Sequence, residues 1–377
     1  MSTERLFDLQ APIIYLFRPG EIVWYDVYGN STNWRLAVIS RRRLNGESKA
    51  EYWIQPLSNP RSPQPARVIL QTSLRPWLAW SYPLPVIKPP PGVKLFDDVN
   101  WDEALKGTYG RNENDPECVI DGSILAAQQV DASYSLFNKL KTTASGNETQ
   151  HSYIGMFLGA ERIWVGEPVR LHVPGSQEVT VMVIKYLIET HPTAAVDSNA
   201  TSSSSDAILS ASTLTIIGDV YELIETNQER EERAWQPRNF PARMAEDIRW
   251  RNEISRPKGR FLEWKTREIN VKRGVADIAG RWYETKEMVS YIRDGGVIQQ
   301  EMRAGTMKDV GKDLNRRMHQ TQATLSNERR RNRKHTLGES VPADLKISKG
   351  KDGPEEDDAF PGAAPPSQAN VPMDLDN

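Results

Sequence analysis

Apolar residues alternate with polar ones in two separate stretches of the chain, which is the pattern of half-buried β-strands. The first stretch predicts four strands, over residues 22–28, 34–42, 51–57 and 67–74. Turn-forming residues separate these runs, and the Asn45-Gly46 pair between two of them favours a tight hairpin. Four short strands with tight connections predict a small SH3-like β-barrel over residues 13–82.

The second stretch contains three strand-like runs, at residues 160–171, 179–189 and 212–225. In the middle run, alternation puts Val179, Val181 and Val183 on one face. Met182, Ile184, Tyr186 and Ile188 fall on the other face. A strand that is apolar on both faces requires cover on both sides, so this run predicts a core strand of a curved sheet.

A short phrase occurs twice, once in each stretch. Phe17 to Trp24 and Ile163 to Arg170 share an apolar residue, then Gly-Glu, then Val at matching offsets. Two copies of so short a phrase are weak support for a duplication, but they suggest that one kind of β-module is used twice.

The remaining segments predict helices and connections. A Pro-rich spacer at 88–92 and short helices at 100–107, 121–130 and 135–140 place a linker packed on the β-modules over residues 83–157. Beyond residue 229 the pattern becomes helical, with a last helix that Gly295-Gly296 is expected to stop. The second β-module with its C-terminal helices therefore spans residues 158–310. The predicted fold class is mostly β with appended helices (α+β).

Residues 311–377 lack apolar periodicity and predict a disordered tail with an acidic end. A basic pair and a basic cluster in this tail have the spacing of a two-part nuclear import signal, although the cluster is also compatible with a nucleic-acid tether. The residues of the predicted import signal are Arg316, Arg317, Arg329, Arg330, Arg331, Arg333 and Lys334.

Composition narrows the possible functions. The formal net charge of −2 excludes a uniformly basic protein, so any nucleic-acid contact requires a local patch. The single cysteine, Cys118, excludes an intrachain disulfide and a cysteine-rich zinc site. With no long apolar run, the sequence predicts a soluble intracellular protein. It contains no phosphate-binding loop, metal-ligand spacing or nucleophile motif, so we expect no catalytic residues, metal or cofactor, and no enzyme.

Two features of the first stretch are candidates for binding. Its aromatic residues suit either the barrel core or a cage for methylated lysine, formed by Trp24, Tyr25, Trp34 and Trp53. The run Arg41-Arg42-Arg43 fits either phosphate contacts or a solvated strand end.

The order of these phrases resembles one known family. LRPWLAWS at 74–81 and GAERIWVGEPVRL at 159–171 are distinctive, and similarity to the fungal cryptic loci regulator family of transcription-silencing proteins extends over about residues 14–293. The resemblance implies a non-enzymatic nuclear subunit of a heterochromatin complex, whose partners are a histone deacetylase and a nucleosome remodeller. It also implies that the second module is similar to a bromo-adjacent homology domain. Known members have a longer N-terminus, where a DNA-binding region is expected.

This resemblance leads to two hypotheses about binding. The leading one is an adaptor that docks to other subunits through Trp164, Arg170, Trp250 and Trp282. The alternative is a direct reader of nucleosomes, DNA or modified histones. Neither hypothesis involves a membrane or a small-molecule substrate.

Overall fold

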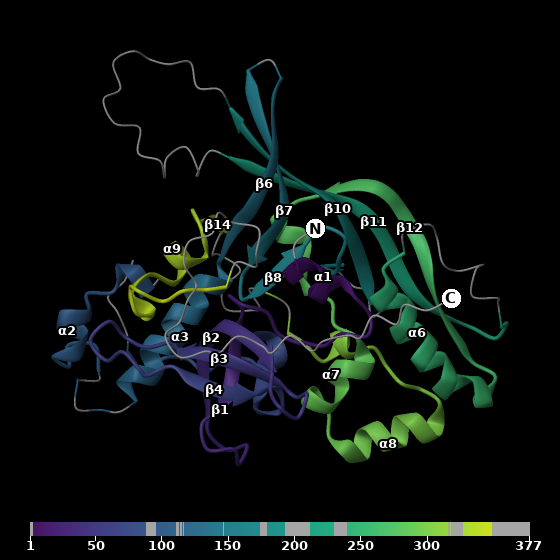
Figure 1. The fold of residues 1–377 in the computed structure, drawn as a ribbon, viewed down its shortest axis with the longest axis horizontal. Coiled ribbons are helices and arrows are strands. Elements are labelled where there is room, and N and C mark those ends of the chain that lie inside the picture. The colour runs from purple at the N-terminus through teal and green to yellow at the C-terminus, as the bar shows by residue number, and fades with distance from the viewer. Residues whose placement is uncertain are drawn as a thin grey trace, which may run out of the picture.

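The structure is a computed structural model dominated by two antiparallel sheets with helices packed around them (Figure 1). Mostly β structure with several helices agrees with the predicted fold class. The structure describes residues 3–87, 96–110, 113, 115, 117–145, 147–173, 179–192, 212–229, 240–315, 317 and 327–348. The predicted spacer at 88–92 lies outside these residues, as do Arg316 and residues 349–377.

The first sheet has five strands in the order β4-β3-β2-β1-β5. All four predicted strands are present, with the last divided in two by a single 3₁₀ turn. The bounds are β1 (Ile22–Asp26), β2 (Trp34–Leu44), β3 (Ala50–Pro56), β4 (Arg67–Leu70) and β5 (Leu74–Pro76). The predicted Asn45-Gly46 turn joins β2 to β3, where the Asn45 N–H donates to the Lys49 carbonyl at 2.9 Å.

Two of the three helices predicted before residue 158 are confirmed. They are α2 (Trp101–Leu105), whose first turn is capped by the Asn100 side chain, and α3 (Cys118–Asp131). The helix expected at 135–140 is wrong, because these residues belong to β6 (Ser133–Ser145), which pairs along its length with β7 (Glu148–Leu158). Leu140 is exposed on β6, and the hairpin of β6 and β7 projects from the rest of the molecule (Figure 1).

The second sheet has nine strands, with the main order β12-β11-β10-β7-β6-β14. The other strands are β8 (Glu161–Trp164), β9 (Pro168–Leu171), β10 (Thr180–Pro192), β11 (Thr213–Thr226), β12 (Phe261–Arg273) and β13 (Ile278–Arg281). The residues of β12 were expected to be helical, yet they pair with β11 over the whole strand. Strands β10, β11 and β12 curve together around α6 (Ala242–Ser255).

Strand β10 is covered on both faces, as predicted, but its alternation changes partway along. Val181 and Val183 pack in one apolar cluster, and Met182 and Ile184 pack in another. A bulge between Ile184 and Tyr186 adds one residue to the strand and reverses the facing of the residues that follow. Tyr186 is therefore exposed, contrary to the prediction, and Leu187 is buried in its place.

Helices follow the second sheet. α7 (Thr285–Ile292) matches the predicted last helix, but Gly295-Gly296 begins a further helix, α8 (Gly295–Ala304), instead of ending the series. The Asp294 side chain accepts a hydrogen bond from the Gly296 N–H at 2.7 Å, which caps the new helix.

The prediction of disorder beyond residue 311 is wrong for residues 327–348. This C-terminal segment contains β14 (Glu328–Arg329), which pairs in parallel with β6, and α9 (Arg333–Leu337), which lies beside α3. Leu337 and Val341 join the largest apolar cluster. Because the segment is rich in charged residues, its sequence pattern did not reveal that Leu337 and Val341 anchor it.

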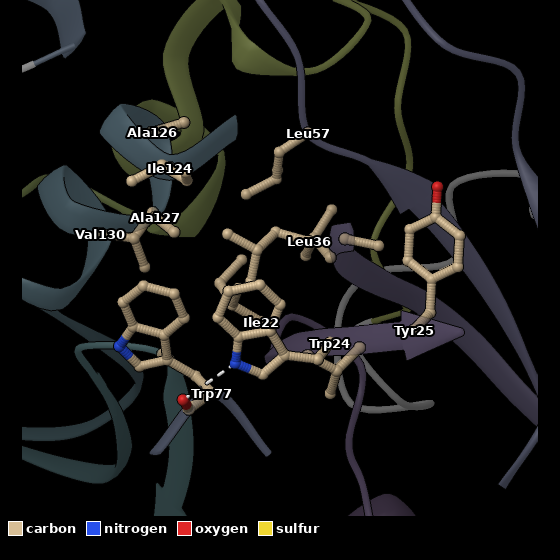
Figure 2. Close-up of a cluster of buried hydrophobic side chains, with 14 of the residues drawn as sticks. Ile22, Trp24, Tyr25, Leu36, Leu57, Trp77, Ile124, Ala126, Ala127 and Val130 are labelled. Atoms are coloured by element: carbon tan, nitrogen blue, oxygen red, sulfur yellow. Dashed lines mark hydrogen bonds between the residues drawn. The ribbon is translucent and has the colours of Figure 1, made fainter. Parts of the chain in front are cut away.

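The largest apolar cluster unites residues that are distant in the sequence. Figure 2 shows Ile124, Ala127 and Val130 of α3 facing Ile22 and Leu36 of the first sheet, while Trp24 and Trp77 lie together. Ala160, Tyr283 and Met288 belong to the same cluster. The first sheet and α3 therefore share one core with residues that follow strands of the second sheet, whose own apolar side chains lie in two further clusters.

Candidate functional site: two Gly-Glu turns and a buried ion network

The repeated Gly-Glu phrase forms two turns with the same hydrogen bonds. In the first turn, the Arg18 N–H donates to the Glu21 carboxylate at 2.9 Å, and the Glu21 N–H donates to the Arg18 carbonyl at 3.0 Å. In the second turn, the Trp164 N–H donates to Glu167 at 2.8 Å, and the Glu167 N–H donates back at 3.2 Å. The sequence repeat therefore corresponds to a structural repeat.

The same strand contacts accompany both turns. Gly20 and Gly166 have φ values of 90° and 100°, which glycine adopts without the steric cost that a side chain adds. Their N–H groups donate to the carbonyls of Ile39 and Ile184 at 2.6 and 2.7 Å. Each of these isoleucines is the last residue before a bulge in its strand, β2 or β10. Each β-module thus contains one turn that packs against one bulged strand.

Arg18 links the two modules directly. Its backbone belongs to the first turn, while its guanidinium donates to Glu167 of the second turn at 2.6 Å. Arg243 of α6 reaches the same Glu167 at 2.8 Å and also binds Glu284, which precedes α7. All four side chains are buried. One carboxylate therefore holds the first module, the second module and the C-terminal helices together.

A second part of this network surrounds Glu21. The Arg162 N–H donates to the Glu21 carboxylate at 3.1 Å, and the Arg281 guanidinium lies 3.4 Å from it. The backbone N–H of Arg281 donates to Glu161 at 2.6 Å, and the Tyr283 hydroxyl donates to the same carboxylate at 2.8 Å. Buried charges of both signs are thus arranged alternately between the sheets, which offsets the cost of removing each from water.

The N-terminal helix α1 (Thr3–Leu9) closes the network with Asp8. Asp8 forms an ion pair with Arg42 at 2.6 Å and accepts a hydrogen bond from the Trp164 indole N–H at 2.7 Å. Burial acts to raise the pKa of Asp8, but Arg42 and Arg18 outweigh it and hold this pKa well below its usual range. Asp8 is therefore ionised at neutral pH.

Burial dominates at Glu21, where it raises the pKa of the carboxyl against the opposing influence of Arg281 and Arg18. At Glu284, burial is outweighed by Arg243, and the pKa is lowered. These carboxylates differ in pKa, but all are enclosed by arginine and backbone partners. The arrangement suits a structural lock better than proton transfer to a substrate.

Three of the four predicted docking residues lie in this interior. Trp164 and Trp282 are 0% exposed and Arg170 is 5% exposed. Arg170 donates to the carbonyls of Arg281 and Asn315 at 3.1 and 3.2 Å, so it connects the chain to the segment after α8. These residues offer no surface to a partner in this fold, which corrects the prediction. Trp250 is partly exposed on α6.

The four predicted cage residues do not surround a common space. Trp24 stacks on Trp77 at 5.6 Å between centroids, whereas the neighbouring Tyr25 points away from it and lies under Arg67 (Figure 2). Trp34 contacts Trp80, 4.9 Å away. Trp53 is covered by two arginines. Adjacent residues on one strand face opposite sides of the sheet, so Trp24 and Tyr25 cannot line the same cage.

The predicted phosphate contacts divide between interior and surface. Arg42 is buried in the ion pair with Asp8. Arg41 and Arg43 are exposed, with guanidinium carbons 5.5 and 4.5 Å from the centroid of Trp53. Only these two remain available to a ligand.

Some of the described residues of the predicted import signal are buried, and others are exposed. Arg333 is buried and donates to the carbonyls of Gly20 and Gly159, both at 2.7 Å, so it contacts both modules. Arg329 pairs with Glu189 at 2.6 Å, and Arg330 pairs with Glu328. Arg317 is buried, whereas Arg331 and Lys334 are exposed. Most of these side chains support the fold, and an import receptor would find few of them free.

Among the described residues, no group of three or more metal-ligating side chains lies close enough to hold an ion. No described helix is long and apolar enough to cross a membrane. Sequence reasoning missed Arg18, Arg243 and Glu284. The available signal was the repeated Gly-Glu phrase, which marks the turns but does not reveal the arginines that reach them.

The fold and the network define a class of protein, a scaffold of two largely antiparallel β-sheets connected by buried ion pairs. Residues 152–284 match the family model described as transcription-silencing protein Clr2. This segment is therefore similar to the Clr2 transcription-silencing family, as the sequence resemblance predicted. The matched segment extends from β7 to the residue before α7 and contains the second Gly-Glu turn.

Among solved structures, the chain is similar to one described as "Structure of Clr2 bound to the Clr1 C-terminus". The TM-score is 0.46 at 13% sequence identity, and the match covers 91% of this chain and 60% of that chain. This chain thus spans less than two thirds of that protein. No curated protein matches the sequence.

Proposed function

We propose that this chain is a non-enzymatic nuclear subunit of a heterochromatin silencing complex. It acts as an adaptor that brings a histone deacetylase and a nucleosome remodeller to chromatin. The observation that carries the proposal is the Clr2 family match over residues 152–284, which supports a role in transcriptional silencing. The adaptor function and the composition of the complex are the parts of this proposal that go beyond a general silencing role.

The geometry supports a binding role because the matched segment belongs to a rigid unit. Glu167 lies in this segment and binds Arg18 of the first module and Arg243 of α6. A partner that binds one module is thereby held in a fixed orientation relative to the other. We propose that residues 13–82 form an SH3-like module and residues 158–310 a module similar to a bromo-adjacent homology domain, connected through residues 83–157.

Partner docking on the matched segment requires exposed side chains. Among its described large apolar residues, Tyr186 and Ile269 are exposed, at 57% and 66%. They flank a polar cluster in which the Lys185 ammonium contacts Asp219 and Asn270 at 2.7 and 2.9 Å. Apolar anchors beside ordered polar groups are a common form of protein interface. We therefore choose these two side chains for the first test of partner docking.

Affinity purification of the tagged full chain from fungal nuclei, followed by mass spectrometry, tests the adaptor role. We expect a deacetylase and a remodelling ATPase to co-purify. Tyr186→Ser with Ile269→Ser should reduce their recovery and leave thermal stability unchanged, because both side chains are exposed. Histones and DNA recovered without these enzymes, and lost as salt rises, would contradict the adaptor and favour direct chromatin reading.

A further inference from the structure

The outer face of β2, β3 and β4 presents a basic and apolar surface. Strand register places Arg41 beside Trp53, and Trp53 beside Val68 of β4. One step along, the cross-strand neighbours are Arg43, Glu51 and Leu70. Val68 and Leu70 are among the exposed large apolar side chains, and β4 is the edge strand of its sheet.

The charge on this surface is not balanced within the described part of the chain. Arg43 pairs with Glu51 at 3.1 Å, but Arg41 forms no ion pair with any described residue. Both guanidiniums lie over the Trp53 ring. Two cations that share one indole repel each other, so an additional carboxylate is favourable here. The surface fits an acidic peptide that also carries an apolar side chain.

The C-terminal segment delivers such a peptide to this place. Its last described residue, Ser348, donates its N–H to the carbonyl of Ser40 at 2.9 Å, and Ser40 immediately precedes Arg41. Leu345 and Ile347 pack against the main core, so this exit point is fixed. The sequence then continues through Asp352 to the acidic run Glu355-Glu-Asp-Asp358 and Phe360.

The connecting length is sufficient. Glu355 lies seven positions after Ser348, and an extended chain covers roughly 3.3 Å per residue, so the acidic run can reach about 23 Å from Ser40. Gly350, Gly353 and Pro354 in the connection permit a turn back over the sheet. Arg41, the residue after Ser40, is well within this distance.

We propose that residues 352–360 dock in cis on the surface formed by Arg41, Arg43, Trp53, Val68 and Leu70. The acidic run binds the two arginines, and Phe360 covers the apolar side chains of β4. The chain's own tail thereby competes with other acidic ligands for this basic surface. This inference does not depend on the proposed adaptor role.

Magnitudes favour a reversible contact. Exposed ion pairs are weak because water screens them, so the tail peptide should bind weakly when it is a separate molecule. A short tether raises its effective concentration to the millimolar range. If the separate peptide has a Kd of about 0.1 mM, an effective concentration of about 1 mM occupies the surface and weakens a competitor about tenfold.

A competition experiment tests the proposal. The probe is a fluorescent peptide with the sequence of residues 350–362, and anisotropy reports its binding to two full-length proteins. One is the wild type. The other has a neutralised tail with Glu355→Gln, Glu356→Gln, Asp357→Asn and Asp358→Asn. We expect saturable binding to the neutralised protein and about tenfold weaker binding to the wild type.

Two further variants identify the surface. Arg41→Gln with Arg43→Gln, added to the neutralised tail, should abolish peptide binding, whereas Arg331→Gln removes an exposed charge elsewhere and should preserve it. Circular dichroism checks that each variant is folded. Equal affinity for wild type and neutralised protein, no saturable binding up to millimolar peptide, or binding that survives without the two arginines would each overturn the proposal.

Discussion

Glu167 is one of the buried side chains that join the two modules. It binds two buried arginines from distant parts of the chain. Glu167→Gln keeps the shape but removes the charge, and it leaves Arg18 without a carboxylate close to its terminal nitrogens. Breaking a buried pair in this way costs about 3–5 kcal/mol. We expect the urea midpoint to fall sharply.

Glu47→Gln is the matched control. Glu47 also pairs with a cation, Lys49, at 2.7 Å, but both side chains are largely exposed. Exposed pairs contribute about 0–1 kcal/mol, so this variant should unfold close to the wild type. Similar losses for the two variants would show that the buried network is not a major source of stability.

Gly20 tests the close approach of the first turn to the second sheet. A Cβ at Gly20 would lie 2.4 Å from the Phe157 ring, whereas at Gly29, also at positive φ, it would meet nothing within 4 Å. Backbone strain is common to Gly20→Ala and Gly29→Ala, so the difference between them measures the clash. We expect Gly20→Ala to lower the melting temperature by several degrees more. Equal losses would contradict the packing of this turn on Phe157.

The sequence identified the Gly-Glu turns but assigned Trp164 and Arg170 the wrong environment. An indole next to a Gly-Glu turn looks the same in sequence whether it faces solvent or core. The environment of Trp164 is determined by the Asp8 carboxylate, which accepts the hydrogen bond of the indole N–H. Asp8 lies on a helix 156 positions away in the sequence. Contacts this far apart in the chain leave no local pattern.

Secondary-structure elements were predictable where alternation was strong and chain neighbours were also partners. Strands β1 to β4 satisfy both conditions. The residues of β6 and β12 carry a mixed pattern, and pairing with β7 and β11 determines their conformation. The bulge in β10 could not be predicted from the sequence, because one added residue changes the face on which Tyr186 lies without changing the composition of the strand.

β14 and α9 hold the C-terminal segment against both modules, and their attachment is sensitive to acid. Burial acts to raise the pKa of Glu189, but Arg329 and Tyr153 outweigh it and lower this pKa to about 2 from an ordinary 4.5. A lowered carboxyl pKa adds stability above pH 4.5, and this stability is lost as the pH falls towards 2.

Arg329→Gln removes the ion pair that stabilises ionised Glu189. We expect it to destabilise the protein near neutral pH and to differ less from the wild type as pH falls below 4.5. Chemical denaturation across this range measures the difference, with the exposed Arg331→Gln as the control. A difference that stays constant with pH would contradict the role of this ion pair.

In the described part of the chain, the first sheet, α3 and the C-terminal segment share the largest apolar cluster, and buried hydrogen bonds join this unit to the second sheet. Arg333 illustrates this arrangement, because it binds the carbonyls of Gly20 in the first module and Gly159 beside the second sheet. Among the described residues, candidate binding surfaces are exposed around Tyr186 and around Trp53. Tyr186 lies within the segment that matches the Clr2 family model.

Tethering the chain to a reporter gene tests silencing by recruitment most directly. The full-length protein, fused to a sequence-specific DNA-binding domain, is placed upstream of an active reporter in fungal cells, and transcript and histone acetylation are measured at that site. We expect both to decrease, and we expect Tyr186→Ser with Ile269→Ser to weaken the effect at equal protein level. An unchanged transcript and unchanged acetylation, with the fusion folded and bound at the reporter, would contradict it.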